Sequence, residues 1–214
     1  MSQAPPEAPK DCPLCPRLVG YREANQRAEP TWFNGAAPSF GDPSARLLIV
    51  GLAPGRTGAN RTGRPFTGDY AGDLLYGTLK KLGLAEGEYR ADPNDGFTLK
   101  GAMITNAVRC APPENKPTPA EIATCRPFLT SRMAHLPTVR AIMALGSIAH
   151  ESVLRAHSLK PTAAKFGHAV EAQLPDGRTL VSSYHCSRYN TQTRRLTAEM
   201  FEAVMQRAKD LAFA

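Results

Sequence analysis

The sequence lacks the features that mark membrane and secreted proteins. None of its 214 residues belongs to an apolar run that reaches the roughly 18 residues of a membrane span. The opening stretch, MSQAPPEAPKDC, contains acids and prolines and no apolar core, so it does not resemble a secretory signal. We therefore expect a cytoplasmic, nucleoid-associated protein that contacts no membrane.

Ordered histidine motifs and repeats are also missing. The five histidines are scattered and show no H-x-x-x-H spacing, which disfavours a metal-dependent nucleotide hydrolase. We find no internal repeat, and only residues 1–11 are of low complexity. We interpret 1–11 as a disordered tail and 12–214 as a single domain, expected to be a monomer.

Acidic residues are fewer than basic ones. The chain has 26 Lys and Arg against 19 Asp and Glu, a formal net charge of +7. Such a surplus favours a polyanionic partner, nucleic acid first, because cationic side chains neutralise phosphates.

Strand-like and helix-like segments alternate along the chain. The four strand-like runs are 46–50, 102–108, 139–145 and 179–184. Helical spacing or capping signals mark 17–27, 71–84, the segment opening at Thr118, 146–156 and 196–211. This alternation predicts an α/β fold: a three-layer α/β/α sandwich around a mostly parallel four-stranded sheet. Ligands of such sheets lie at the carboxyl ends of the strands.

The loop 51–69, after the first strand, is the most informative segment. Its glycines, including Gly51, let the backbone approach a ligand closely. Phe66 is an aromatic ring in a polar loop, and Asp69 is an isolated carboxylate. Three arginines of the loop could hold phosphates: Arg56, Arg61 and Arg64. We expect a pocket that stacks a flat ring beside an acid.

Alternative roles exist for these residues. Phe66 could belong to the core, and Asp69 could cap the helix that begins near Tyr70. Asp73, one turn further along, is the competing carboxylate.

Two later strand exits carry further polar side chains. The amide of Asn106 suits the edge of a nucleobase, although it could also cap a turn. His185 could stabilise negative charge or exchange a proton, and Arg188 and Arg194 belong to a basic loop that either follows phosphates or is only solvated. The neighbouring Cys186 points to the opposite face of the strand, which disfavours a Cys–His dyad.

Five cysteines, an odd number, are poorly explained by disulfides in a reducing compartment. Cys12 and Cys15 form a C-x-x-C pair, and Cys110 and Cys125 form a wider one. Four thiolates can ligate zinc or an iron–sulfur cluster, and the wide second pair favours the cluster. Four buried free thiols remain the alternative.

These motifs together resemble the family 5 uracil-DNA glycosylases, the iron–sulfur branch of that superfamily. The resemblance rests on GLAPG at 51–55, GANRTGRPFTGD at 58–69, NAVRCAPP at 106–113 and YHCSRYNTQT at 184–193. It extends from Cys12 to the C-terminal helix. Arg194 departs from the pattern, because a glycine is expected after Thr193.

The resemblance implies a role for each candidate residue. Phe66 is expected to stack on a flipped base, Asn106 to contact its edge, and His185 to face its carbonyl. Asp69 is expected to assist water or stabilise the sugar cation. The remaining implied residues are Gly51 and Ala53 at the base and Asn190 in the catalytic histidine loop.

The resemblance also implies a cofactor and an activity. Cys12, Cys15, Cys110 and Cys125 would hold a structural [4Fe–4S] cluster. The activity would be monofunctional hydrolysis of the N-glycosidic bond of uracil in DNA, extending to other deaminated bases such as hypoxanthine, at the start of base-excision repair. The alternative is a damaged-DNA binding protein that does not turn over or stays covalently trapped on its product.

Overall fold

The computed structural model describes residues 5–214. The first four residues of the predicted tail lie outside this range. Within it, no helix combines the length and the apolar character needed to cross a membrane.

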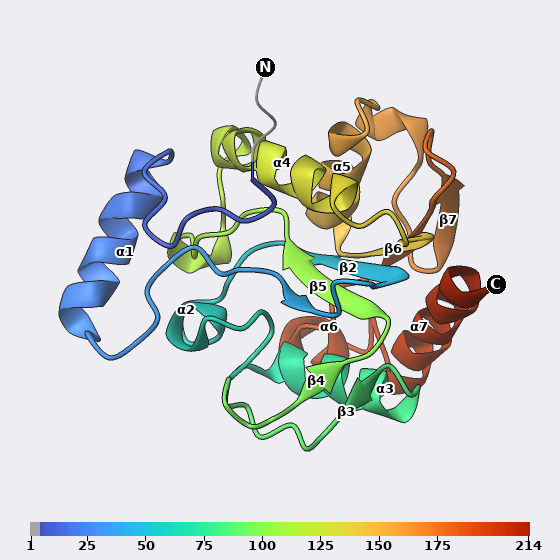
Figure 1. Cartoon of the computed structure of the whole chain (residues 1–214), viewed down its shortest axis with the longest axis horizontal. Helices are drawn as coiled ribbons and strands as arrows, with labels where there is room; N and C mark the ends of the chain where they lie inside the picture. The colour runs from blue at the N-terminus through green and yellow to red at the C-terminus, as the bar shows by residue number, and fades with distance from the viewer. Residues whose placement is uncertain (1–4) are drawn as a thin grey trace.

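Four buried parallel strands form the centre of the sheet, as the sequence predicts (Figure 1). They are β2 (Leu47–Gly51), β5 (Ala102–Asn106), β6 (Ala141–Leu145) and β8 (Thr179–Ser183), adjacent in the order β5-β2-β6-β8. Every residue of these strands is buried. Continuous apolar runs suit this position because both faces of a parallel sheet are covered.

Short strands that the sequence did not reveal extend the sheet to six. β1 (Phe40–Gly41) pairs antiparallel with β5, and β7 (Val170–Gln173) pairs antiparallel with β8. β3 (Ala85–Glu86) and β4 (Thr98–Leu99) form a separate two-stranded sheet. These strands are too short or too polar to give a two-residue hydrophobic period.

The five predicted helices are confirmed within a few residues. They are α1 (Pro16–Ala28), α3 (Tyr70–Lys81), α4 (Pro119–Ala134), α5 (Ser147–Ala156) and α7 (Ala198–Phe213). Thr118 forms the predicted capping box with Glu121. Four short helical segments were not predicted: α2 (Ala59–Thr62), η1 (Pro113–Asn115), η2 (Pro161–Ala163) and α6 (Arg188–Gln192).

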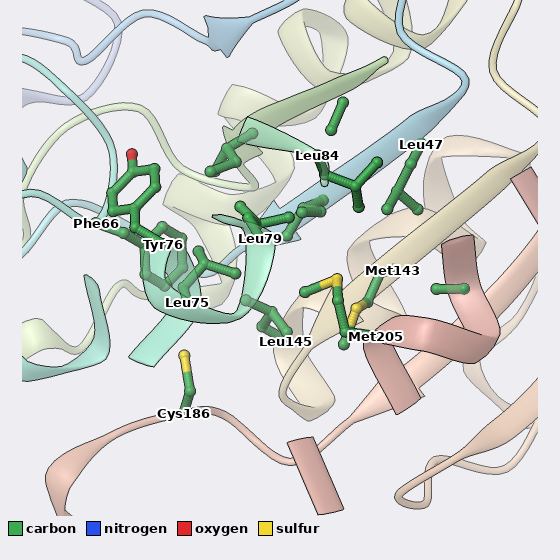
Figure 2. Packing of buried hydrophobic residues seen from close by; sticks show 14 of the residues in the cluster. Leu47, Phe66, Leu75, Tyr76, Leu79, Leu84, Met143, Leu145, Cys186 and Met205 are labelled. Atoms are coloured by element: carbon green, nitrogen blue, oxygen red, sulfur yellow. The ribbon is translucent and has the colours of Figure 1, made fainter. Parts of the chain in front are cut away.

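Helices cover both faces of the sheet, which confirms the three-layer arrangement. α3 and α7 lie on one side and α4 and α5 on the other (Figure 1). The first side buries the larger apolar cluster, which extends from Phe66 and Tyr76 to Met143 and Met205 (Figure 2). This packing fixes the strand ends where the candidate site lies.

The end of the predicted tail makes contacts that the sequence did not indicate. Glu7 accepts a hydrogen bond from Arg109 Nη1 at 2.7 Å and also pairs with Arg132. Ala8 is buried next to Cys12 in a third small apolar cluster. These contacts join the segment before α1 to the loop after β5.

Arg64 was expected to hold phosphates, but its guanidinium is buried and does not face solvent. Its guanidinium donates to both carboxylate oxygens of Asp95, at 2.8 and 2.9 Å, and to Thr67 Oγ1 at 2.7 Å. The Arg64 side chain is 4% exposed and that of Asp95 is fully buried. A bidentate pair of this kind joins the glycine-rich loop to the connection before β4.

Asp95→Asn should therefore lower the free energy of unfolding by about 3–5 kcal/mol at neutral pH, since it leaves a buried guanidinium without its counter-charge. Hydrogen bonds from Arg64 hold the pKa of Asp95 below its ordinary value. A lowered folded-state pKa stabilises the fold above the unfolded pKa, so the difference from the parent should shrink as the pH falls below about 4. Urea unfolding at pH 7 and pH 3.5 measures this.

Asp92→Asn is the matched control for that experiment. Asp92 is exposed, and its side-chain oxygen caps the backbone amide of Asn94, a bond that asparagine can replace. It should change stability by less than about 0.5 kcal/mol. Equal stability of the Asp95→Asn variant and the parent at pH 7 would contradict a stabilising role for the ion pair.

Candidate active site

A pocket of about 370 Å³ opens at the carboxyl ends of β2, β5 and β8. Its size is that of a small-molecule site. The pocket is lined by Leu52, Ala53, Pro54, Gly55, Phe66, Asp69, Tyr70, Ala71, Asn106, Asn115, His185, Ser187 and Arg188. The structure thus brings together the ring, the carboxylate, the amide and the imidazole that the sequence singled out.

The floor of the pocket depends on Gly51. Gly51 and Asn106 are register partners at the ends of β2 and β5. A Cβ on Gly51 would lie 2.5 Å from Asn106 Oδ1 and 2.7 Å from the Phe66 ring. Only glycine leaves room for both side chains.

Asn106 carries an unused hydrogen-bond acceptor. The residue is 3% exposed, and its buried Oδ1 has no hydrogen-bond partner among residues 5–214. A buried polar atom without a partner is costly unless a ligand satisfies it. Asn106 therefore faces the pocket as a ready contact for a polar ligand edge rather than as a turn cap.

Phe66 serves both the core and the pocket. It is 8% exposed and packs in the cluster on the α3 side of the sheet, yet it lines the pocket as well. Its ring stacks on His185, with centroids 5.9 Å apart and planes inclined by 25°. Its φ is +53°, and a Cβ on Gly72 would lie 1.7 Å from its carbonyl oxygen. The loop therefore needs a glycine at the start of α3 to hold Phe66 here.

Asp69 both caps a helix and lines the pocket. Its Oδ1 accepts a hydrogen bond from the Gly72 amide at 3.0 Å, and α3 begins at the next residue. Burial raises the pKa of Asp69 above its ordinary value. A Cβ on Gly58 would lie 2.7 Å from Oδ2, so that glycine is also required. Asp73 is exposed and does not line the pocket. Of the two candidate carboxylates, Asp69 is the one that would face a bound ligand.

His185 reaches the pocket from the end of β8. Burial of its imidazole lowers its pKa to about 4, so the ring is neutral at physiological pH. A neutral imidazole can donate one hydrogen bond and accept another. Cys186 is fully buried and does not line the pocket, and its thiol donates toward the Ala71 carbonyl oxygen at 3.5 Å.

Asn190 does not line the pocket. Its Nδ2 donates to the backbone carbonyl of His185 at 2.8 Å. Ser187 caps α6 by accepting a hydrogen bond from the Asn190 amide at 3.4 Å. Asn190 lies in the histidine loop, as expected, and its side chain positions that loop from outside the pocket.

The remaining arginines differ in accessibility. Arg188 lines the pocket mouth over the ring of Tyr70, and Arg61 and Arg194 are exposed. Arg56 is half-buried and donates to Asn25 Oδ1 at 2.7 Å. Arg194 has a φ of +56°, the left-handed conformation that favours the glycine expected there.

Asn115 lines the pocket and was not singled out in the sequence. It lies in the proline-rich segment after Cys110, where Glu114 and Asn115 have φ values of +55° and +58°. Asparagine adopts this conformation more readily than most residues. An asparagine between the prolines, close after a strand exit, was the available signal. Leu52 and Tyr70 also line the pocket and were likewise not singled out.

The four cysteines of the predicted cluster surround one small space. Cys12, Cys15, Cys110 and Cys125 all line it, at the contact between the N-terminal segment, the loop after β5 and α4. Within residues 5–214, no three His, Cys, Asp or Glu side chains are close enough to hold a single metal ion.

Four thiols can hold either of two kinds of group. One zinc ion draws four sulfurs to about 2.3 Å from a single point, whereas a multi-iron cluster holds them further apart. Burial raises the pKa of the free thiols, to about 12 at Cys110 and about 11 at Cys125. The lining supplies the four thiols that either a zinc site or an iron–sulfur cluster would need.

Comparisons with known proteins agree with the motifs. Residues 38–209 match the uracil DNA glycosylase superfamily. The chain is 50% identical to the type-5 uracil-DNA glycosylase of Thermus thermophilus, over 94% of each chain. It is 45% identical to the type-5 enzyme of Mycobacterium leprae, over 94% of this chain and 91% of that one. The identity to the Mycobacterium bovis type-5 enzyme is 43%, over 94% of this chain and 78% of that one. The chain therefore belongs to the uracil-DNA glycosylase superfamily and, within it, to the type-5 family.

Proposed function

We propose that the protein hydrolyses the N-glycosidic bond of uracil that has been flipped out of DNA, and so initiates base-excision repair. One observation carries this proposal: an aromatic ring, a carboxylate, an amide and an imidazole meet in one pocket, from Phe66, Asp69, Asn106 and His185. The buried Asn106 Oδ1 there has no partner in the described part of the chain. The relatives of the chain are uracil-DNA glycosylases.

Base recognition begins with removal of the nucleotide from the duplex. Rotation of a nucleotide out of the stack costs a few kcal/mol, and least for a mismatched pair. Stacking on an aromatic ring such as Phe66 returns about 1–3 kcal/mol. Uracil presents an N–H between two carbonyl groups. Asn106 Oδ1 accepts from that N–H, and its Nδ2 is available to a neighbouring carbonyl.

Bond cleavage develops charge of opposite sign on base and sugar. The sugar gains oxocarbenium character, as in other glycosyl hydrolyses. The departing uracil gathers negative charge on O2. His185, neutral because burial lowers its pKa to about 4, donates a hydrogen bond to that oxygen. Asn190 and Ser187 hold the loop that presents the imidazole.

Asp69 is the carboxylate that acts on the sugar side. Its Oδ1 is held by the Gly72 amide, which fixes the carboxylate in place. Its negative charge offsets the sugar cation or orients the attacking water. The raised pKa of Asp69 keeps it a better proton acceptor than an exposed aspartate.

DNA phosphates are held outside the pocket by the accessible arginines. Arg188 lines the pocket, Arg61 and Arg194 are exposed in α2 and just after α6, and half-buried Arg56 follows the glycine-rich motif. Each phosphate contact releases condensed counter-ions, so affinity should fall with salt. Arg64 takes no part, because its guanidinium is buried against Asp95.

The four cysteines that line the small space beside α4 would hold a [4Fe–4S] cluster. When bound, the cluster would join the N-terminal segment of Cys12 and Cys15 to Cys110 after β5 and to Cys125 in α4. The hydrolysis derived above needs no electron transfer. We therefore propose a structural role for the cluster.

Asp69→Asn should reduce the single-turnover excision rate about 10²- to 10⁴-fold, because it removes the charge that acts on the sugar and water. Affinity for uracil-containing DNA should change little. Asn caps helices as well as Asp, and the buried charge is gone, so the melting temperature at pH 7 should stay equal or rise. Burial raises the pKa of Asp69, so the ionised carboxylate destabilises the parent fold above that pKa. The advantage of the Asn variant in melting temperature should therefore disappear as the pH falls below it.

Asp73→Asn is the control on the same helix and should retain the parent rate. A parent-like rate in the Asp69→Asn variant would remove Asp69 from catalysis. A protein–DNA adduct that survives SDS would instead indicate a protein trapped on its product.

Phe66→Leu should raise the KM for uracil-containing DNA and weaken inhibition by free uracil, each about fivefold or more, since leucine fills the core but offers no ring for stacking. Steady-state kinetics and thermal melting measure the two effects. Phe40→Leu is the control: Phe40 packs edge-on against Tyr76 outside the pocket. Unchanged KM and inhibition in the Phe66→Leu variant would reduce Phe66 to a core residue.

The protein purified without oxygen should be brown, with broad absorbance near about 400 nm, because thiolate-bound iron–sulfur centres are coloured. Cys110→Ala should remove the colour, whereas Cys186→Ala should retain it. Iron and zinc analysis completes the measurement. Colourless parent protein with stoichiometric zinc would contradict the cluster.

A further inference from the structure

A second hollow lies outside the base pocket and shares no residue with it. This open groove of about 570 Å³ is lined by residues 31–33 after α1, by Arg61 and Thr62 of α2, and by residues 90–93. The base pocket is lined by later residues of the same glycine-rich loop, among them Phe66 and Asp69. The groove is therefore a separate surface, and among its lining residues only Arg61 was assigned to DNA phosphates above.

Two aromatic rings form part of this groove. Trp32 and Phe33 are half-buried, and both line it. A guanidinium lies over the ring of Trp32, from Arg56 at 5.0 Å, and the Lys10 ammonium lies over Phe33 at 4.8 Å. Aromatic rings bordered by cations are the arrangement on which bases of single-stranded nucleic acid stack.

Charge at the groove is mostly positive. Arg61 and Arg90 line it and are exposed, and Lys10 and Arg56 adjoin its rings. Asp92 is the acidic residue of the lining. Guanidinium groups suit phosphate oxygens, and their excess here favours a backbone that runs along the groove.

The walls of the groove are tied to one another before any ligand binds. The Phe33 amide donates to the Arg61 carbonyl at 2.9 Å, which joins the first wall to α2. The opposite wall is joined to Arg64 through Asp95, whose Oδ2 also accepts from the Arg90 amide at 3.0 Å. A surface already in its final shape loses little entropy on binding.

The groove is close enough to the base pocket to be reached by one strand. The guanidinium of Arg61 borders Gly68, since a Cβ on that glycine would lie 2.5 Å from Arg61 Nη2. Gly68 is the residue before Asp69, which lines the base pocket. A strand that places its base over Phe66 therefore has to cross only this loop to reach Arg61.

We propose that this groove binds an unpaired nucleotide that flanks the flipped base, with its base on Trp32 and its phosphates at Arg61 and Arg90. The proposal rests on the proposed function in one respect: the bound nucleotide belongs to the DNA strand that carries the flipped base. A paired base has both faces covered by its neighbours, so the groove selects single-stranded or locally opened DNA. Stacking is tolerant of base type, and the groove reads no sequence.

Trp32 makes this inference directly testable, because it is the only tryptophan in the chain. The probes are an oligothymidylate of about eight nucleotides and a uracil-free blunt duplex of equal length, a size chosen from the known site sizes of single-strand binders. Titration with the oligothymidylate should quench the tryptophan emission and saturate. The duplex should quench it much less at the same concentration.

Three variants of exposed residues sharpen the test. Arg90→Ala should weaken oligothymidylate binding and reduce the slope of log K against log salt by about 0.7, the value for one phosphate on a single strand. Asp92→Asn should strengthen binding, because it removes the repelling carboxylate and keeps the cap on Asn94. Arg155→Ala, an equal loss of charge on α5, should leave the quenching curve unchanged.

The outcomes separate this inference from the proposed function. Absence of quenching by the oligothymidylate overturns it, as does equal quenching by the duplex or an equal loss in the Arg90→Ala and Arg155→Ala variants. Excision of uracil by a parent protein that shows no quenching would overturn the groove alone. Quenching by a parent that excises no uracil would support the groove and overturn the proposed function.

Discussion

The pairing of Gly51 with Asn106 at the ends of β2 and β5 is the constraint on which the candidate site depends. Parallel strands deliver their carboxyl ends to one edge, so residues more than fifty positions apart become neighbours. The missing Cβ of Gly51 then leaves room for both the Asn106 amide and the Phe66 ring. A larger residue would force these two side chains apart and divide the pocket.

Burial acts in opposite ways on the two titratable groups of the pocket. It lowers the pKa of His185 and raises that of Asp69, because the charged form is disfavoured in both cases. The result at neutral pH is an uncharged imidazole on one side and a carboxylate of increased basicity on the other. These are the two states that a reaction with opposite developing charges requires.

The sequence predicted the parts of the structure that repeat or that close a helix. The four central strands were recognisable because both faces of each strand are buried, and Thr118 and Asp69 were recognisable as caps because the spacing of a cap is local. Long-range partners were not predictable. In the sequence Arg64 resembles the other arginines of its loop, because its partner Asp95 lies thirty-one positions away. Asn115 reaches the pocket only through the left-handed backbone of Glu114 and Asn115. Asn190 belonged to the right loop, but its side chain turns back to the His185 carbonyl.

The left-handed backbone at Phe66 has a consequence for how the pocket evolves and operates. A bulky residue held at positive φ stores about 1–3 kcal/mol, and it remains there only while its surroundings enforce it. Here the helix cap, Gly72 in the first turn of α3 and the apolar cluster supply that enforcement. The fold thus holds the Phe66 ring in its strained position before any nucleobase binds. Substitutions among the residues that support Phe66 should therefore reduce activity even when every side chain that lines the pocket is retained.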